Sequence, residues 1–172
     1  TLYAARWQQI DGRDGGRATL KWVRLGHAAE GQIRHLIDSG IGFSDIFETA
    51  SADEVQAHPQ KYERYRPVTV YEGQGSLRSG PGKPTDEPLY LRVKPGMEMA
   101  AAFLESRKYG AIRGATSEFT KMEGVTHNPQ DKQLFVAMSM IEGGMVADKN
   151  GRRPQDHIRL EGDAADLNCG GI

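Results

Sequence analysis

A cation and a carboxylate two positions apart are the residues of this chain best suited to chemistry. Lys121 and Glu123 lie in an extended run, and side chains two apart on a β-strand project from the same face. We therefore expect them to line one surface, with Met122 pointing the other way into a core. Carboxylates bind hard divalent metals, so Glu123 is a candidate metal ligand. The alternative is an ordinary Lys–Glu pair on a solvated strand face.

The residues that follow predict the element that carries this pair. Asn128–Lys132 has the Asn, Pro and Asp that are typical of a turn. Gln133–Ser139 has the pattern of a returning strand. We therefore predict one β-hairpin of a sheet in this region.

A second hairpin is predicted near the beginning of the sequence. Residues 2–10 and 19–25 are apolar stretches, and the Gly and Asp residues between them suit a turn with positive φ. Asp11 and Asp14 could instead belong to a calcium loop, but the full alternation of oxygen ligands with a distant Glu is missing. The pattern favours a plain turn.

Two helices are expected among the strands. Residues 28–39 carry apolar side chains at helical spacing, and Gly40 is placed to end that helix. Residues 97–109 also have an apolar stripe. Arg107 and Lys108 would lie in the last turn of this second helix, where they complement its dipole.

The fold expected from these segments is mostly β with two helical insertions. Residues 48–88 mix charged residues with Gly and Pro clusters, so we expect a long loop or insertion there. A length of 172 residues fits one domain, and 38% hydrophobic residues indicate a rather polar protein.

Composition also excludes several functions. A net charge of −1 argues against a field that steers nucleic acid, and no apolar run is long enough to predict a membrane span. A single cysteine excludes an internal disulfide, and the five histidines lack the spacing of a zinc motif. The sequence has no serine nucleophile elbow, so an acyl-transfer hydrolase is not expected.

Four segments carry a resemblance to a known family. The longest is EFTKMEGVTHNPQDKQLFVAMSMIEGGM, from Glu118 to Met145. The others are Leu2–Trp7, Lys94–Tyr109, and Asp156–Leu160 running on to Cys169–Gly171. In this order they resemble the PhoX-type bacterial alkaline phosphatases. The resemblance covers most of the chain, although residues 48–88 contribute little to it.

This resemblance implies a fold, an activity and a location. The fold would be part of a β-propeller, with residues 1–172 forming a single partial domain, a fragment of a longer chain. The activity would be calcium-dependent hydrolysis of small-molecule phosphomonoesters, with calcium and iron in the active centre. The resemblance further implies a periplasmic or secreted enzyme.

The resemblance also implies roles for the two candidate residues. The family has an Arg-x-Glu or Lys-x-Glu pair at the corresponding strand, so Glu123 would hold a metal and Lys121 would face the phosphate. A lysine keeps the charge of the arginine but loses the fork that holds two phosphate oxygens at once. The iron-ligating cysteine of the family aligns upstream of this chain, so Cys169 is interpreted as a buried free thiol.

Two other functions remain open. The chain could be a non-catalytic propeller module that binds a partner or structural calcium, with Lys121 and Glu123 as an ordinary ion pair. It could also be a surface or assembly protein that has kept a phosphatase-like scaffold after losing activity. The oligomeric state is open in each case.

Overall fold

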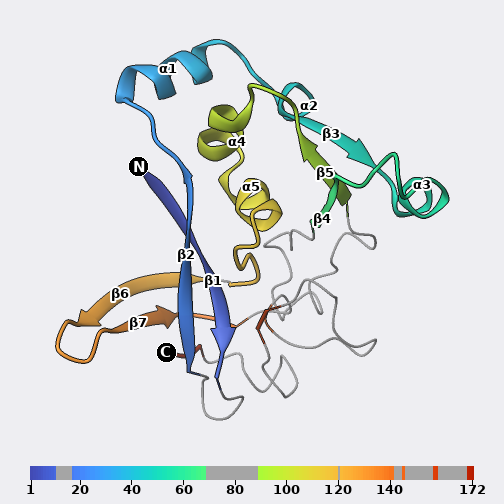
Figure 1. Cartoon of the computed structure of the whole chain (residues 1–172). Coiled ribbons are helices and arrows are strands. Elements are labelled where there is room, and N and C mark those ends of the chain that lie inside the picture. Colours follow the sequence, from blue (N-terminus) through green and yellow to red (C-terminus); the bar gives the residue numbers. More distant parts are fainter. Residues whose placement is uncertain (11–16, 69–88, 120, 142–144, 146–156, 159–169) are drawn as a thin grey trace. The chain divides into compact units, whose positions relative to one another are not determined.

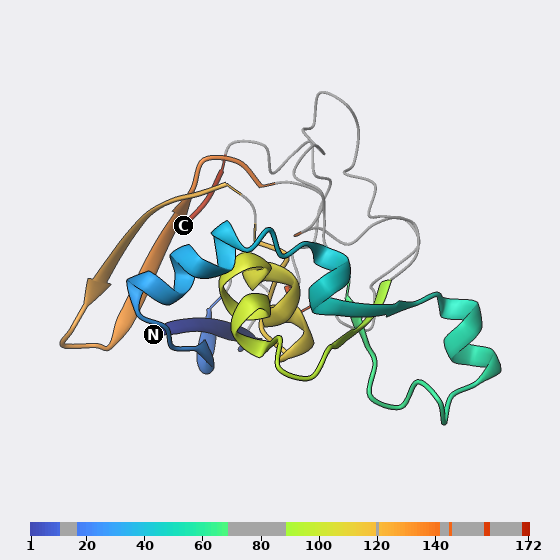
Figure 2. The same ribbon diagram turned by 90° about the horizontal axis from the view of Figure 1, so that it is seen from above.

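The computed structural model (Figures 1 and 2) describes residues 1–10, 17–68, 89–119, 121–141, 145, 157–158 and 170–172. The chain divides into two compact units. The first comprises Thr1–Trp7, Leu20–Val70 and Thr85–Ser117. The second comprises Gln8–Thr19, Tyr71–Pro84 and Glu118–Ile172.

The hairpin expected at the start of the sequence is confirmed. Strands β1 (Leu2–Gln9) and β2 (Ala18–Gly26) pair in a two-stranded sheet. The Ile10 amide donates a hydrogen bond of 2.8 Å to the carbonyl of Arg17 at the closed end. Asp11 and Asp14, the alternative calcium-loop residues, lie outside the described residues.

A three-stranded sheet lies in the first unit. Strand β5 (Leu89–Val93) is central, with β3 (Phe47–Ala50) and β4 (Arg66–Val68) antiparallel on either side. Its residues alternate between the two faces, so Leu91 is fully buried while the neighbouring Arg92 is partly exposed.

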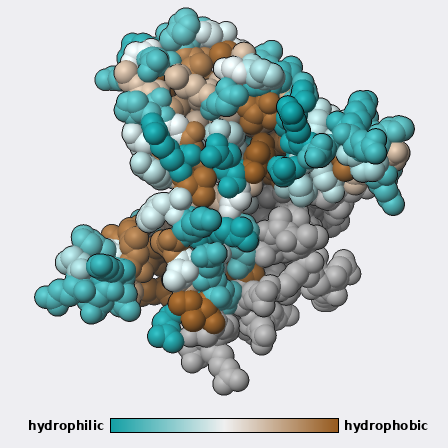
Figure 3. All heavy atoms as spheres, viewed as in Figure 1, coloured by the Kyte–Doolittle hydropathy of each residue, from teal (hydrophilic) through white to brown (hydrophobic). Residues whose placement is uncertain are grey.

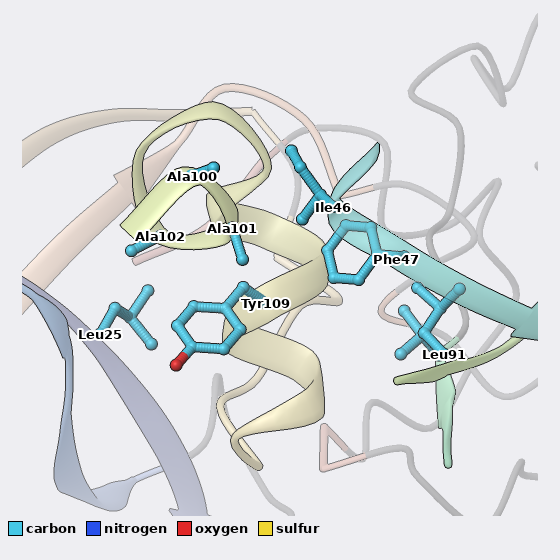
Figure 4. Close-up of a cluster of buried hydrophobic side chains, with 9 residues drawn as sticks. Leu25, Ile46, Phe47, Leu91, Ala100, Ala101, Ala102 and Tyr109 are labelled. Carbon is cyan, nitrogen blue, oxygen red and sulfur yellow. The ribbon is translucent and has the colours of Figure 1, made fainter. Parts of the chain in front are cut away.

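Helices α4 (Glu98–Leu104) and α5 (Ser106–Ile112) cover this core. Side chains from β2, β3, β5, the short helix α2 (Phe43–Ile46), α4 and α5 converge in Figure 4, and Tyr109 reaches in toward Leu25. The alanines of α4 are almost fully buried, which lets the backbone of this helix approach the sheet closely. The labelled core residues are Leu25, Ile46, Phe47, Leu91, Ala100, Ala101, Ala102 and Tyr109.

The helix expected at residues 97–109 is in fact two helices. Helix α4 (Glu98–Leu104) ends at Glu105, whose φ of −131° and ψ of 42° are not helical, and α5 (Ser106–Ile112) begins there. The expectation of one helix was wrong because the break redirects the chain so that Tyr109 packs in the core. Arg107 and Lys108 therefore lie in the first turn of α5, not in a last turn.

The helix expected at residues 28–39 is confirmed as α1 (Glu30–Asp38). Gly40 follows it with φ of +64°, the left-handed conformation that suits a helix end. In Figure 2, α1 lies on one side of α4, and the short helix α2 (Phe43–Ile46) also contacts α4.

Part of the range expected to be a long loop is regular structure. Within residues 48–68 lie the end of β3, helix α3 (Ala52–Ala57) and β4, and residues 69–88 lie outside the described part of the chain. Helix α3 begins in a capping box: the Ser51 amide donates to Glu54 Oε2 at 2.8 Å, and the Glu54 amide donates to Ser51 Oγ at 3.2 Å.

The hairpin expected after Glu123 is confirmed in the second unit. Strands β6 (Met122–Asn128) and β7 (Gln133–Met138) are antiparallel, with Asn128 opposite Gln133. Asn128 Oδ1 accepts the Gln130 amide at 3.0 Å, an Asx turn that reverses the chain. Lys132 has φ of +54°, which completes the turn before β7 begins.

The described residues are more strand than helix, as expected. Their sheets have two, three and two strands, and the pairs β3–β5, β4–β5 and β6–β7 are antiparallel. None of the helices in these ranges is long and apolar enough to cross a bilayer.

Candidate functional site

Glu123 lies at a β-bulge near the start of β6. Met122 is opposite Met138 and Gly124 is opposite Ala137, so Glu123 is the extra residue on the bulged strand. A bulge bends its strand and re-aims the side chain beside it. The Glu123 side chain is exposed, so its carboxylate is accessible to solvent ions.

Lys121 precedes this bulge in an unusual backbone conformation. Its φ is +47°, and the strand begins one residue later. Lysine has a Cβ that disfavours this left-handed region, and such conformations concentrate at functional sites. The argument that Lys121 and Glu123 share a strand face therefore does not apply. Both side chains are described and exposed, and no ion pair joins them.

Met122 does not point into a core, contrary to expectation. Its side chain is 58% exposed. The expectation assumed a strand with one face packed on other elements, whereas β6 belongs to a two-stranded sheet whose residues are mostly exposed.

Ser139 joins the two candidate residues. Its backbone amide donates to the carbonyl of Lys121 at 3.0 Å, and its hydroxyl donates to Glu123 Oε1 at 2.9 Å. Glu123 Oε2 has no hydrogen-bond partner among the described residues. Sequence reasoning missed Ser139, although the hairpin register places it directly after the residue opposite Met122.

A second carboxylate of the same unit is buried. Glu118 is 3% exposed, and its Oε2 accepts the amides of His157 at 3.0 Å and Ile158 at 2.9 Å. The His157 ring nitrogen Nδ1 is 3.7 Å from Glu118 Oε1. These bonds tie residues 157–158 to Glu118, which gives this carboxylate a structural role.

The fit of the implied metals to these residues is partial. Glu123 offers a carboxylate oxygen, and hard cations such as calcium prefer oxygen ligands. Within the described ranges, no group of three or more His, Cys, Asp or Glu residues is gathered as a metal site. Glu123 therefore fits as one ligand of a calcium site, the described residues offer no fit for iron, and Cys169 lies outside them.

A charged cluster in the first unit is a separate feature that the sequence did not reveal. Arg92 Nη2 on β5 donates to Glu48 Oε1 on β3 at 2.7 Å, and the Tyr65 hydroxyl donates to Glu48 Oε2 at 2.7 Å. These hydrogen bonds, that from Arg92 first, hold the pKa of Glu48 below its ordinary value. Burial and the bond to Glu48 raise the pKa of Tyr65. Both Glu48 oxygens accept a hydrogen bond, and the bond from Arg92 links β5 to β3, so the cluster stabilises the sheet.

The β6–β7 hairpin also exposes apolar side chains. Val125 is 68% exposed, Leu134 42% and Phe135 43%. Figure 3 shows hydrophilic side chains gathered at the turn of the hairpin and hydrophobic ones along its strands. The strand Gln133–Met138 carries no charged residue.

Comparisons with known proteins found no relative of this chain: no family model, no curated protein and no solved structure matches it.

Proposed function

We propose that the chain contributes a metal- and phosphate-binding strand to a metal-dependent phosphatase that hydrolyses small-molecule phosphomonoesters. The observation that carries this proposal is the Lys121–Glu123 arrangement. The exposed carboxylate of Glu123 lies at a β-bulge, accepts a hydrogen bond from Ser139, and is two residues after a lysine with φ of +47°. Bulges and strained backbone of this kind cluster next to active sites.

Each residue has a definite task in this proposal. Glu123 would supply one oxygen ligand to a calcium ion, and such an ion neutralises charge on the transferring phosphoryl group and activates the attacking oxygen. Lys121 would attract the phosphate as a point charge. An iron ion, also implied by the resemblance, would need ligands beyond the described residues.

The proposed scaffold is a β-propeller whose blades are antiparallel sheets. Support comes from the antiparallel β6–β7 hairpin, which has the pairing of neighbouring strands in a blade. The likeness of the sequence to exported phosphatases makes a periplasmic or secreted location part of the same proposal.

The decisive experiment is hydrolysis of 4-nitrophenyl phosphate at alkaline pH by the longest natural form of the protein. It is measured with calcium, then with a chelator, and then with calcium restored. We expect turnover that the chelator abolishes and calcium restores, and we expect Glu123→Gln to remove most of it. No turnover with calcium and iron fully loaded would overturn the proposal.

The 172-residue chain by itself is expected to be inactive. The metal ligands of a propeller would come from different blades, and Glu123 alone cannot form a metal cluster, so ligands outside the 172-residue chain would have to complete it. Turnover by the 172-residue chain equal to that of the longest natural form would contradict this expectation.

A non-catalytic binding or assembly protein is the second candidate. The exposed apolar side chains of the β6–β7 hairpin favour it, since an uncharged strand at the edge of a small sheet is a template for pairing with another chain. In that case Glu123→Gln would change stability slightly and abolish nothing.

A further inference from the structure

Among the residues that the structure describes, Ser139 is the one that forms hydrogen bonds with both Lys121 and Glu123. Its amide bonds to the Lys121 carbonyl at 3.0 Å, and its hydroxyl bonds to Glu123 Oε1 at 2.9 Å. The first bond fixes the backbone beside the bulge. The second fixes the direction of a carboxylate that is otherwise exposed.

The position of Ser139 is itself fixed from the other side of β7. Met138, the preceding residue, exchanges two backbone hydrogen bonds with Gly171: the Met138 amide donates at 2.8 Å and the Gly171 amide donates at 3.0 Å. The end of β7 is therefore held on both edges, by β6 on one and by Gly171 on the other. A hydroxyl on such a fixed segment can orient a flexible side chain.

We propose that Ser139 is the positioning residue of the Glu123 carboxylate. It holds Oε1, so that Oε2 is presented to a hard cation in one orientation. Metal-ligating carboxylates are commonly held by such a second hydrogen bond, and its loss typically lowers metal affinity by about 10- to 100-fold. The metal part of this inference rests on the proposed function, whereas the hydrogen bond that orients Glu123 does not.

The test uses the longest natural form of the protein and calcium alone as the probe, followed by NMR of the labelled Glu123 carboxyl group. The variants are Ser139→Ala, Ser139→Thr and Glu123→Gln. Thr126→Ala is the matched control, because it removes from the same hairpin an exposed hydroxyl that does not bond to Glu123. Since the site is exposed, we expect the smaller end of the range, a loss of about tenfold in calcium affinity for Ser139→Ala.

The other variants separate positioning from stability. Ser139→Thr keeps the hydroxyl and should restore calcium affinity to within about twofold, well below the tenfold loss. Thr126→Ala should bind as the unchanged chain does, and Glu123→Gln should not bind. A general loss of hairpin stability would not be rescued by threonine alone.

A second readout needs no metal. Side-chain coupling constants of Glu123, measured without calcium, should indicate one rotamer in the unchanged chain and in Ser139→Thr, and averaging in Ser139→Ala. Unchanged coupling constants in Ser139→Ala overturn the inference, whatever calcium does.

The failures are therefore distinguishable. If Glu123→Gln abolishes calcium binding while Ser139→Ala binds normally, the positioning role is wrong and the metal role of Glu123 stands. If the unchanged chain does not respond to calcium, the metal role of Glu123 is wrong, and the coupling constants alone decide whether Ser139 orients it.

Discussion

The buried carboxylate of Glu118 accepts hydrogen bonds from two backbone amides, so replacing this single residue should change the stability of the fold. Removing it in Glu118→Ala leaves the amides of His157 and Ile158 without this acceptor. Each unsatisfied buried donor costs about 1–3 kcal/mol, so we expect a loss of about 3 kcal/mol in unfolding free energy. Glu118→Gln keeps one acceptor oxygen and should lose less. Urea unfolding measures both, with the exposed Glu63→Ala as control; equal stability of all variants would refute the role.

The Glu48–Arg92–Tyr65 cluster predicts a pH dependence. The pKa of Glu48 is lowered in the folded state, mainly by the hydrogen bond from Arg92 and then by that from Tyr65. At pH values above the ordinary Glu48 pKa of 4.5, the ionised carboxylate therefore stabilises the fold in full. This contribution is lost as pH falls through the lower pKa of the folded state.

Replacing Glu48 tests this sign. At pH 7, Glu48→Gln should lower the unfolding free energy by less than about 1 kcal/mol, because the pair is partly exposed and salt screens it. Below the folded pKa the difference should shrink. Unfolding curves at pH 7 and at a series of lower pH values measure it, and a difference that grows toward acid would show that the sign is wrong.

At the residue scale, the sequence could identify only part of the site. Lys121 and Glu123 stand out by type and spacing, but their relation depends on the bulge and on the φ of Lys121. Ser139 and the buried Glu118 depend on contacts between residues far apart in the sequence. Spacing arguments do not reach such contacts, whereas the register of the hairpin would have led to Ser139.

Elements were predictable where a local signal exists. Asn128 forms a turn through its side-chain hydrogen bond to the backbone, and Gly40 ends a helix by adopting a positive φ. Both were predicted from the sequence. The break at Glu105 has no Gly or Pro to announce it and follows from packing. The capping box of Ser51 and Glu54 was a readable signal for α3 that the composition of its surroundings concealed.

Gly170 provides a prediction at the scale of an element. Its φ is +83°, and an added Cβ would lie 2.3 Å from the carbonyl oxygen of Met138. Gly170→Ala should therefore break the bridge between Met138 and Gly171 and cost about 2 kcal/mol or more. Gly31→Ala is the control, since a Cβ there meets nothing within 4 Å and alanine favours its helix. Amide exchange at Met138 measures the effect, and protection equal to that of the unchanged chain would contradict it.

For the molecule as a whole, the alternating apolar segments were sufficient to predict more strand than helix. The division into two units was not predicted, because it depends on which distant segments pack together. The propeller and the phosphatase activity come from resemblance alone, so they stay proposals. What the described residues add is an accessible carboxylate and an uncharged, exposed strand in the same hairpin.

The exposed strand separates the two proposed functions of the whole protein. If β7 serves assembly, a charge at Phe135, which is 43% exposed, should block pairing between chains, since charged side chains on edge strands prevent such contacts. Sedimentation of Phe135→Lys should then show a smaller species than the unchanged chain. Gln130→Lys, which adds the same charge in the turn outside the strand, should not change the sedimentation. In an enzyme whose hairpin contributes only Lys121 and Glu123, all three chains should sediment alike, and a smaller Phe135→Lys species would favour assembly.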